Sequence, residues 1–530
     1  MKRVWDRAYK KYEKAEFIYR RLCTVFFIAV VLCGGGVLWW LTTATPRAEL
    51  KYFEEDYVMK IPLSVRLGLV KSNRLSPQNL DEISAKISAE VHKFAIQTQF
   101  ILKFTIEKLV FNSIEEANKY QAAATQNAAV NILLIDSVQW PYFSSKKVHL
   151  GSKFWSYAQW DDEDIQKTCS RINFAIRDVM IDVNHLISIV RRDQKKAMGA
   201  LEIASLPAAQ QKRHIWDSAA LSVMYNVHLI YLHHYSENAH REEFSSYKSI
   251  EEEALTAAHR FANRIRNVTD LYVTAEHLWD FDLSSFLTMD VQRRTVIEHN
   301  QIANLISGID ASTSTVESSQ PLIKIVVLES EDPIMFLDDH ADDTNAFAIA
   351  SWGGIVAPKR FDEDSDSKLR SSASQNVLGV LRVLLGMDSD LDAMHSRDAA
   401  PVSDWEIERL KLRSFVDNTM RCVSSIEAIH QLTGSIDNIA VSNYVSQLVN
   451  SSVTFLESGI AQMERADSRT LDSILKARFL ADKSINEPTL LGLLYFSPDQ
   501  KLAVYVPLVM PVLMPILSSL RALYQELRST

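Results

Sequence analysis

The densest group of side chains that could bind a metal lies in ESEDPIMFLDDHADDTNAF, residues 329–347. Clustered carboxylates beside an imidazole can bind Ca²⁺ or Zn²⁺, because these ions take oxygen ligands and Zn²⁺ also takes imidazole nitrogen. The spacing lacks the alternating acidic pattern and glycine of a calcium loop. A solvated acidic loop between two strands is therefore the favoured interpretation, and a metal-dependent hydrolase is the alternative. The residues concerned are Asp338, Asp339, His340, Asp342 and Asp343.

The other reactive residue types do not form a catalytic motif. The sequence has no G-x-S-x-G, H-E-x-x-H, P-loop or C-x-x-C pattern. Cys169 lies on a predicted helix without an evident histidine partner, so a buried structural thiol is favoured over a nucleophile. His233 and His234 end a predicted strand and point to opposite faces, which makes them poor joint ligands. We therefore expect no catalytic residue, no metal site and no cofactor.

Composition limits the classes of partner and the redox chemistry. The chain has 530 residues, 47% hydrophobic and 23% charged, with a net charge of −9. Residues 1–21 carry eight basic and three acidic side chains, so the remainder is strongly acidic and a nucleic-acid partner is excluded. Cysteines are few, and Cys169 and Cys422 are the two in the large body. They could form a bridge or remain buried free thiols.

Residues 22–44 form an uncharged run that is long enough to cross a membrane as a helix. A cleaved signal peptide is the alternative, but its apolar part is usually shorter. The basic residues 1–21 place the N-terminus in the cytosol by the positive-inside rule. The body that follows would then be luminal or extracellular.

Residues 502–521 form a second apolar run, which contains three prolines spaced four residues apart. A removable glycolipid-attachment signal is the alternative, but charged residues follow the run and no polar spacer precedes it. We expect a retained membrane helix that returns the chain to the cytosol, with residues 522–530 as a cytosolic tail. Prolines at this spacing share one helix face and are candidates for packing against partner helices: Pro507, Pro511 and Pro515.

The predicted secondary structure of the body between the two runs changes once along the chain. Residues 45–374 alternate strand and helix patterns, which predicts an α/β domain with a sheet covered by helices. Strands are expected at Met59–Val70 and Leu221–Tyr235, and a helix from Ser76 to Leu109. Residues 375–501 read as a helical region. Further strands are expected at Leu271–Leu278, Leu322–Glu329 and Trp352–Val356, and a helix from Trp160 to about Leu201.

Two N-glycosylation sequons lie in this body. They are Asn267-Val268-Thr269 and Asn450-Ser451-Ser452. Their number is close to what chance would produce, so they do not by themselves indicate a secreted domain. With the body in the lumen, Asn267 and Asn450 become candidate glycosylation sites.

Four strings, in this order, resemble the PIG-S family, which forms one subunit of the GPI-anchor transamidase. The string after the first run carries a tryptophan pair, threonines and Arg-Ala. The string that contains the second run is the most specific of the four. The resemblance covers both termini and the C-terminal half. The strings are LWWLTTATPRAEL, TNAFAIASWGGI, Trp405-Glu406 with Arg409 and then Gly434, Ile436, Asn438 and Ile439, and LLYFSPDQKLAVYVPLVMPVLMPILSSL.

The resemblance implies an endoplasmic-reticulum membrane complex that joins a preassembled GPI lipid to the new C-terminus of a precursor protein. In that family the chemistry belongs to a caspase-like subunit, PIG-K, which uses a Cys–His pair. The other subunits implied as partners are PIG-T, PIG-U and GPAA. The expected role is thus a non-catalytic structural subunit with a luminal body and cytosolic termini. A luminal hydrolase using Asp338–Asp343 and a cell-surface receptor-like protein are the alternatives.

Overall fold

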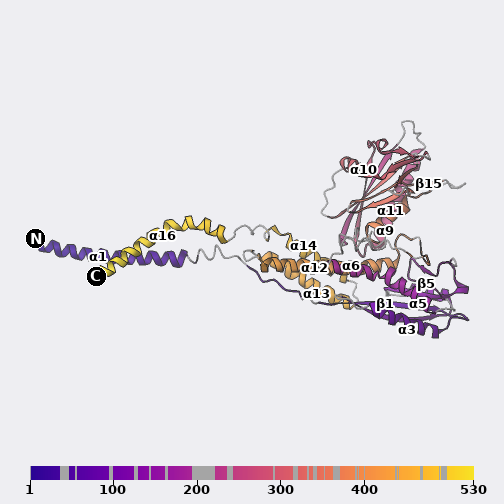
Figure 1. The fold of residues 1–530 in the computed structure, drawn as a ribbon, viewed down its shortest axis with the longest axis horizontal. Coiled ribbons are helices and arrows are strands. Elements are labelled where there is room, and N and C mark those ends of the chain that lie inside the picture. Colours follow the sequence, from indigo (N-terminus) through magenta and orange to yellow (C-terminus); the bar gives the residue numbers. More distant parts are fainter. Residues whose placement is uncertain are drawn as a thin grey trace. The chain divides into compact units, whose positions relative to one another are not determined.

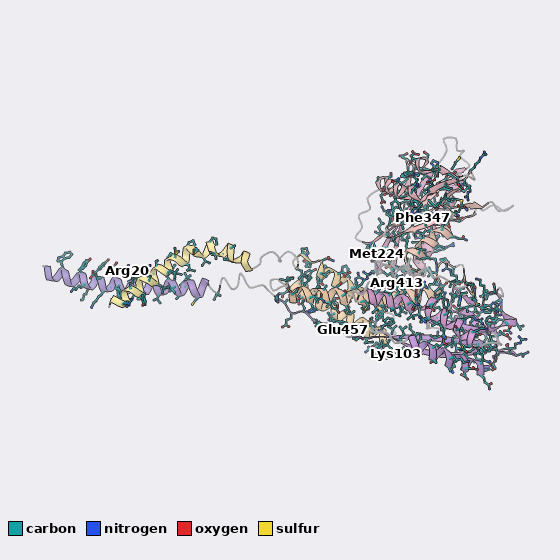
Figure 2. The ribbon with its side chains drawn as sticks, viewed as in Figure 1. Arg20, Lys103, Met224, Phe347, Arg413 and Glu457 are labelled. Atoms are coloured by element: carbon teal, nitrogen blue, oxygen red, sulfur yellow. The ribbon has the colours of Figure 1, made fainter. Side chains whose placement is uncertain are left out.

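The structure of the chain is a computed structural model with side chains (Figures 1 and 2). Its internal contacts divide the chain into two compact units. The terminal unit comprises Met1–Phe53, Cys422–Thr454 and Phe479–Thr530, and the α/β unit comprises Glu54–Arg421 and Phe455–Arg478. The described residues are 2–35, 37, 47–53, 57–94, 100–123, 129–142, 145–160, 165–193, 221–234, 243–290, 293–313, 320–330, 333–337, 343–350, 352–361, 370–387, 391, 393–398, 400–435, 439, 441–465, 469–488, 490 and 498–529.

The first sheet of the α/β unit has the strand order β17-β4-β5-β3-β1-β2. β1 is parallel to both β2 and β3. Its buried residues alternate with more exposed ones over its first part, and its last four residues are all buried. The helices α3 (Pro77–Phe94) and α4 (Ile114–Ala123) pack on it. The strands are β1 (Met59–Val70), β2 (Phe100–Phe111), β3 (Val130–Asp136), β4 (Val148–Leu150), β5 (Ser156–Trp160) and β17 (His395–Arg397).

Two helix predictions in this region were wrong in part. The helix from Ser76 ends at Phe94, and Phe100–Phe111 forms the edge strand β2, in register with β1 over its full length. Its polar residues alternate outward, and Lys103 is one of the exposed ones (Figure 2). The expected long helix from Trp160 is broken at Asp182, where φ is 56°. Its pieces are α5 (Ile165–Phe174), a π-helix (Ala175–Met180) and α6 (Val183–Asp193).

The second sheet has the order β13-β14-β10-β6-β7, and its last four strands are parallel. One face packs against α9 (Glu243–Ile265) and α11 (Ala373–Leu384), the other against α10 (His299–Ser312). Gly353 has φ 155°, and a Cβ there would lie 1.8 Å from the Lys324 carbonyl oxygen, so only glycine lets β14 approach β10. The strands are β6 (Met224–His234), β7 (Asp270–Leu278), β10 (Leu322–Ser330), β13 (Ala346–Ile349) and β14 (Gly353–Val356).

Smaller elements complete the α/β unit. A four-stranded sheet has the order β12-β11-β9-β8, and two strands form a separate ribbon. Short 3₁₀ turns occupy Ser137–Gln139 and Ser284–Phe286. The strands are β8 (Thr288–Met289), β9 (Thr295–Glu298), β11 (Ile334–Leu337), β12 (Asp343–Thr344), β15 (Arg360–Phe361) and β16 (Arg370–Ser371).

The sequence therefore predicted mixed α/β structure followed by helices, but the structure has two main sheets instead of one. The α/β part also extends beyond residue 374, because α11 packs on the second sheet and β17 pairs with β4 of the first. The long helices then follow, and they contribute residues to both units. They are α12 (Asp404–Ser435), α13 (Asn443–Glu464) and α14 (Thr470–Ile485).

Two further helices lie near the ends of the chain and contact each other within the terminal unit. α1 (Lys2–Ala29) continues as a π-helix over Val30–Gly35, so the basic residues 1–21 share one helix with the start of the apolar run. Among the described residues, Tyr9–Gly35 is the one helix long and apolar enough to cross a membrane. Residues 38–44 of the expected span lie outside the described residues. α16 (Pro498–Ser529) is helical through all three prolines.

Candidate functional site

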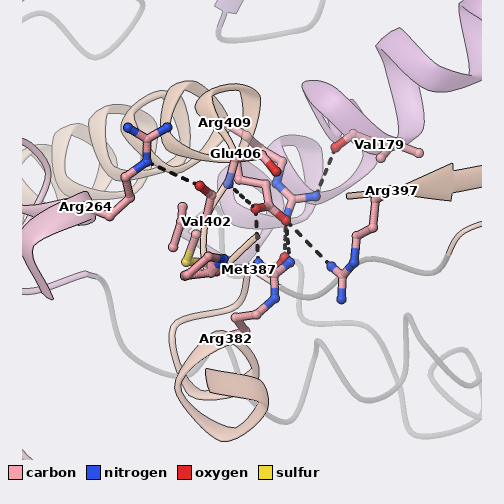
Figure 3. A network of polar contacts seen from close by, with 10 residues as sticks. Val179, Arg264, Arg382, Met387, Arg397, Val402, Glu406 and Arg409 are labelled. Atoms are coloured by element: carbon pink, nitrogen blue, oxygen red, sulfur yellow. Dashed lines mark hydrogen bonds and ion pairs between the residues drawn. The ribbon is translucent and has the colours of Figure 1, made fainter. Parts of the chain in front are cut away.

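A buried polar network surrounds the start of α12 (Figure 3). Ser403 precedes the helix and Glu406 lies in its first turn, in the sequence Ser-Asp-Trp-Glu. Glu406 Oε2 accepts a hydrogen bond from the Ser403 backbone N–H at 2.8 Å. This is half of a capping box, in which the glutamate satisfies a backbone donor that the helix leaves open. The cap fixes where α12 begins.

The same carboxylate binds two arginines. Arg382, from α11, donates to both Glu406 oxygens, at 3.0 Å for Nη1–Oε2, while Nη2 contacts Oε1. Both residues are buried. Arg397, from β17, approaches Glu406 Oε1 at 3.7 Å. A bidentate guanidinium–carboxylate pair of this kind is geometrically specific, and losing one partner would leave a buried charge uncompensated.

Two more arginines bind backbone carbonyls around the same point (Figure 3). Arg409 donates to the Val179 oxygen at 2.9 Å and to the Met387 oxygen at 2.6 Å. Arg264, from α9, donates to the Val402 oxygen at 3.3 Å. The network thus links the first sheet's helical layer and β17 to the helices of the second sheet. The guanidinium group presents several N–H donors in a fixed planar arrangement, so each arginine can fasten two segments at once.

A second cluster of contacts fixes the segment that follows the first apolar run, within the terminal unit. Asn450, on α13, accepts a hydrogen bond from the Lys51 backbone N–H at 2.7 Å. Ser446 Oγ donates to the Glu49 carbonyl oxygen at 2.6 Å, and His430 Nε2 lies 2.9 Å from the Lys51 oxygen. We call Glu49, Lys51, His430, Ser446 and Asn450 the juxtamembrane clamp. It satisfies backbone groups that a loose linker would expose to water.

Apolar packing supports the clamp. Ala48 and Leu50 pack against a buried cluster that includes Val445 and Val449 of α13. Leu490, which precedes α16, is 1% exposed and belongs to the same cluster. The segment after the first apolar run and the segment before the second therefore meet in one hydrophobic core.

The two sequons lie in different surroundings. Asn267 is exposed in the turn between α9 and β7, while Thr269 is buried and donates to the Ser222 carbonyl oxygen at 2.8 Å. Asn450 lies within α13, and its amide nitrogen donates to Ser446 Oγ at 3.2 Å. Ser452, the third residue of that sequon, is fully buried.

The three prolines are exposed on α16 in the chain alone. Each proline removes the N–H that would bond the carbonyl four residues earlier. The spacing leaves the carbonyls of Ala503, Pro507 and Pro511 without that helical donor. Ser518 Oγ donates to the Pro515 oxygen at 2.9 Å, which is not one of these three carbonyls.

The remaining candidates from the sequence are the acidic stretch at 329–347 and the two cysteines of the body. Residues 338–342 of the acidic stretch lie outside the described residues, and Asp343 forms an ion pair with Arg294. Cys169 and Cys422 are buried free thiols. Burial raises the pKa of the Cys169 thiol from 9.0 to about 11, so the thiolate needed by a nucleophile is scarce at neutral pH.

One constellation escaped the sequence analysis because its members are far apart in the chain. His149 Nδ1 lies 2.9 Å from Ser396 Oγ, and His149 Nε2 lies 2.8 Å from Asp398 Oδ1. A serine, a histidine and an aspartate in this order occur in acyl-transfer enzymes. A cavity of about 460 Å³ beside it is lined by Tyr142, Tyr157 and Asp398 among others. Of the described residues that line this cavity, none is His149 or Ser396, so a ligand in it would not meet the serine.

Comparison with known proteins identifies the family of the chain. The profile of the family described as "PIG-S: Phosphatidylinositol-glycan biosynthesis class S protein" matches residues 26–530. The "GPI-anchor transamidase component PIGS" of Rattus norvegicus is 23% identical over 96% of both chains. The protein of that name from Homo sapiens is 22% identical over 96% of this chain and 95% of its own. The profile covers the polar network, the juxtamembrane clamp and α16 alike, and the chain belongs to the PIG-S family.

Proposed function

We propose that this chain is a non-catalytic structural and assembly subunit of a GPI transamidase, the complex that attaches preassembled GPI anchors to the C-terminus of precursor proteins. The observation that carries the proposal is the family match over residues 26–530, with relatives named as a transamidase component along 96% of the chain. The arginine network around Glu406 supports a structural role, because its bidentate ion pair and its contacts to backbone carbonyls fasten segments that are distant in the sequence.

The proposed topology places the chain in the endoplasmic-reticulum membrane with a luminal body and both termini in the cytosol. The uncharged run at residues 22–44 is the proposed first span. The candidate helix Tyr9–Gly35 contains its start, and the basic residues 1–21 favour the cytosolic side. We propose α16 as the second span, which returns the chain to the cytosol. The shared core of Leu50 and Leu490 supports this, because it holds the exit of one span beside the entry of the other.

The proposed partners are the other transamidase subunits, PIG-K, PIG-T, PIG-U and GPAA, with the catalytic cysteine and histidine in PIG-K. In a bilayer the carbonyls freed by Pro507, Pro511 and Pro515 lack water, and each unsatisfied group there costs several kcal/mol. Donors on a neighbouring helix would remove that cost. We therefore assign the proline face of α16 to contacts with partner helices.

Depletion of the chain in its own cells tests the function. We expect surface display of GPI-anchored proteins to fall and precursors with uncleaved C-terminal signals to accumulate in the endoplasmic reticulum. Re-expression of the wild-type chain should restore display. Normal display and normal precursor processing after full depletion would overturn the proposal.

A further inference from the structure

Four titratable side chains converge at the carboxyl edge of the second sheet. His233, His277 and Glu329 lie near the C-terminal ends of the parallel strands β6, β7 and β10. In the strand register, Glu329 pairs with His233 and His277 pairs with Tyr231. Because Tyr231 and His233 are two residues apart, all these side chains share the sheet face that α9 covers. Glu251, on α9, faces them from the helix.

Three possible ligand atoms lie at separations close to those of a tetrahedral metal site. His233 Nε2 lies 3.0 Å from His277 Nδ1 and 3.8 Å from Glu251 Oε1. His277 Nδ1 lies 3.5 Å from the same carboxylate oxygen. Ligand atoms bound to Zn²⁺ at about 2.0–2.2 Å in tetrahedral geometry are roughly 3.3–3.6 Å apart. The three atoms bracket this value, so an ion fits after shifts of a few tenths of an ångström.

His233 lies beside a carboxylate, as many metal-binding histidines do. Glu329 Oε2 lies 3.0 Å from His233 Nδ1, and both side chains are fully buried. A carboxylate at this distance from Nδ1 is placed to orient the ring, and Nε2 is the nitrogen that faces His277 and Glu251. Trp279 stacks on His233 with their ring centroids 3.7 Å apart, and Tyr231 stacks on His277 with their ring centroids 5.0 Å apart. The aromatic rings limit rotation of both imidazoles.

We propose that His233 Nε2, His277 Nδ1 and Glu251 Oε1 bind one Zn²⁺ ion, with Glu329 orienting His233. Two imidazoles and one carboxylate form a ligand set that suits Zn²⁺, with the fourth position open. The side chains of His277 and Glu251 are 39% and 26% exposed, so water can reach that position. The ion would fasten the ends of β6 and β7 to α9. The sequence analysis expected no metal, and the proposed ligands are other residues than the acidic stretch that it weighed.

Metal analysis of the full-length chain tests the site. The chain is purified in mild detergent with a tag that contains no histidine and is dialysed against metal-free buffer. Inductively coupled plasma mass spectrometry should find about one Zn²⁺ per chain, as a three-residue protein site holds. His277→Ala and Glu251→Gln should lose the ion. The matched control is His259→Ala, an exposed histidine on the same helix α9, which should retain it.

Thermal unfolding provides a second measurement. A chelator should lower the melting temperature of the wild-type chain, and added Zn²⁺ should restore it, whereas His277→Ala should respond to neither. Glu329→Gln should weaken Zn²⁺ binding about 10–100-fold, as loss of an orienting carboxylate does. Wild-type chain that holds no Zn²⁺ and melts identically with and without chelator would overturn the site. So would His277→Ala and Glu251→Gln that bind as the wild type does, and the 3.0 Å contact would then be a plain hydrogen bond between two histidines.

Discussion

Asn450 Oδ1 accepts a hydrogen bond from the Lys51 backbone N–H at 2.7 Å, across 399 residues of sequence. The bond joins α13 to the chain just after the first apolar run, and Leu50 and Leu490 pack in the core beside it. A residue that reads in sequence as a glycosylation site is therefore in the structure a fastening point. The contact gives the two sequons different expected glycosylation.

We predict that Asn267 carries a glycan and that Asn450 does not. Asn267 is exposed in a turn, whereas the Asn450 side chain accepts a hydrogen bond from the Lys51 N–H and donates one to Ser446 Oγ. The third residue is buried in both sequons, so it does not distinguish them. Asn267→Gln should abolish the mobility shift caused by peptide N-glycosidase, and Asn450→Gln should leave the shift unchanged. A shift lost only in Asn450→Gln would contradict this assignment. A chain without any glycan would contradict it as well.

Glu406→Ala should destabilise the chain by about 3–5 kcal/mol, because it leaves the buried Arg382 guanidinium without its carboxylate. Thermal unfolding of the protein in mild detergent measures the loss. The control is Glu408→Ala on the same helix, whose partly exposed ion pair with Lys411 should contribute less than about 1 kcal/mol. Equal losses of stability in the two variants would mean that the Glu406 network contributes no more than an ordinary surface ion pair.

The Cys169 thiol should resist alkylation in the folded chain at pH 8, because burial raises its pKa from 9.0 to about 11. The thiol is kept neutral by the fold, so this contribution to stability is present below pH 9 and is lost as the pH rises toward 11. Iodoacetamide labelling followed by peptide mass spectrometry reports the reaction. Denatured protein, in which Cys169 should react fully, is the control. Rapid labelling of the native chain would reopen the question of a reactive cysteine.

Replacing Pro507, Pro511 and Pro515 together with leucine should weaken assembly with the partner subunits while leaving expression intact. The substitution restores the missing N–H groups and alters the proline face that we assign to contacts with partner helices. Native gel electrophoresis of detergent extracts measures the assembled fraction. Val506→Leu with Val509→Leu, at exposed positions of the same helix, controls for a change of apolar surface. Unchanged assembly of the triple variant would leave the prolines as tolerated residues only.

Much of the fold follows from local pattern. β1 was predicted over its observed residues, Met59–Val70, because a long alternation of apolar and polar residues has one interpretation. β2 was missed because its strand pattern follows a helix with only a short connection. β17 has three residues and pairs with β4, which lies more than 240 residues earlier. Pairings of that kind leave no local signal.

The candidate metal site also depends on contacts between residues that are distant in the sequence. His233 was weighed against its neighbour His234, and that pair was judged unsuitable, since adjacent strand residues face opposite sides. The relevant partners come from the ends of the neighbouring strands and from α9. The predicted strands Leu271–Leu278 and Leu322–Glu329 both end near a titratable residue, so the signal was present at the strand ends. The order of the strands, which the sequence does not specify, decides which of these residues meet.

The most direct test of the proposed role is affinity purification of the tagged full-length chain from its own membranes in mild detergent. The account predicts that the chain recovers the other GPI transamidase subunits in constant proportion, including the one with the catalytic cysteine. Asn450→Ala and Glu406→Ala should recover less of the complex per folded chain. Recovery of the wild-type chain alone, or with an unrelated complex, would contradict the account.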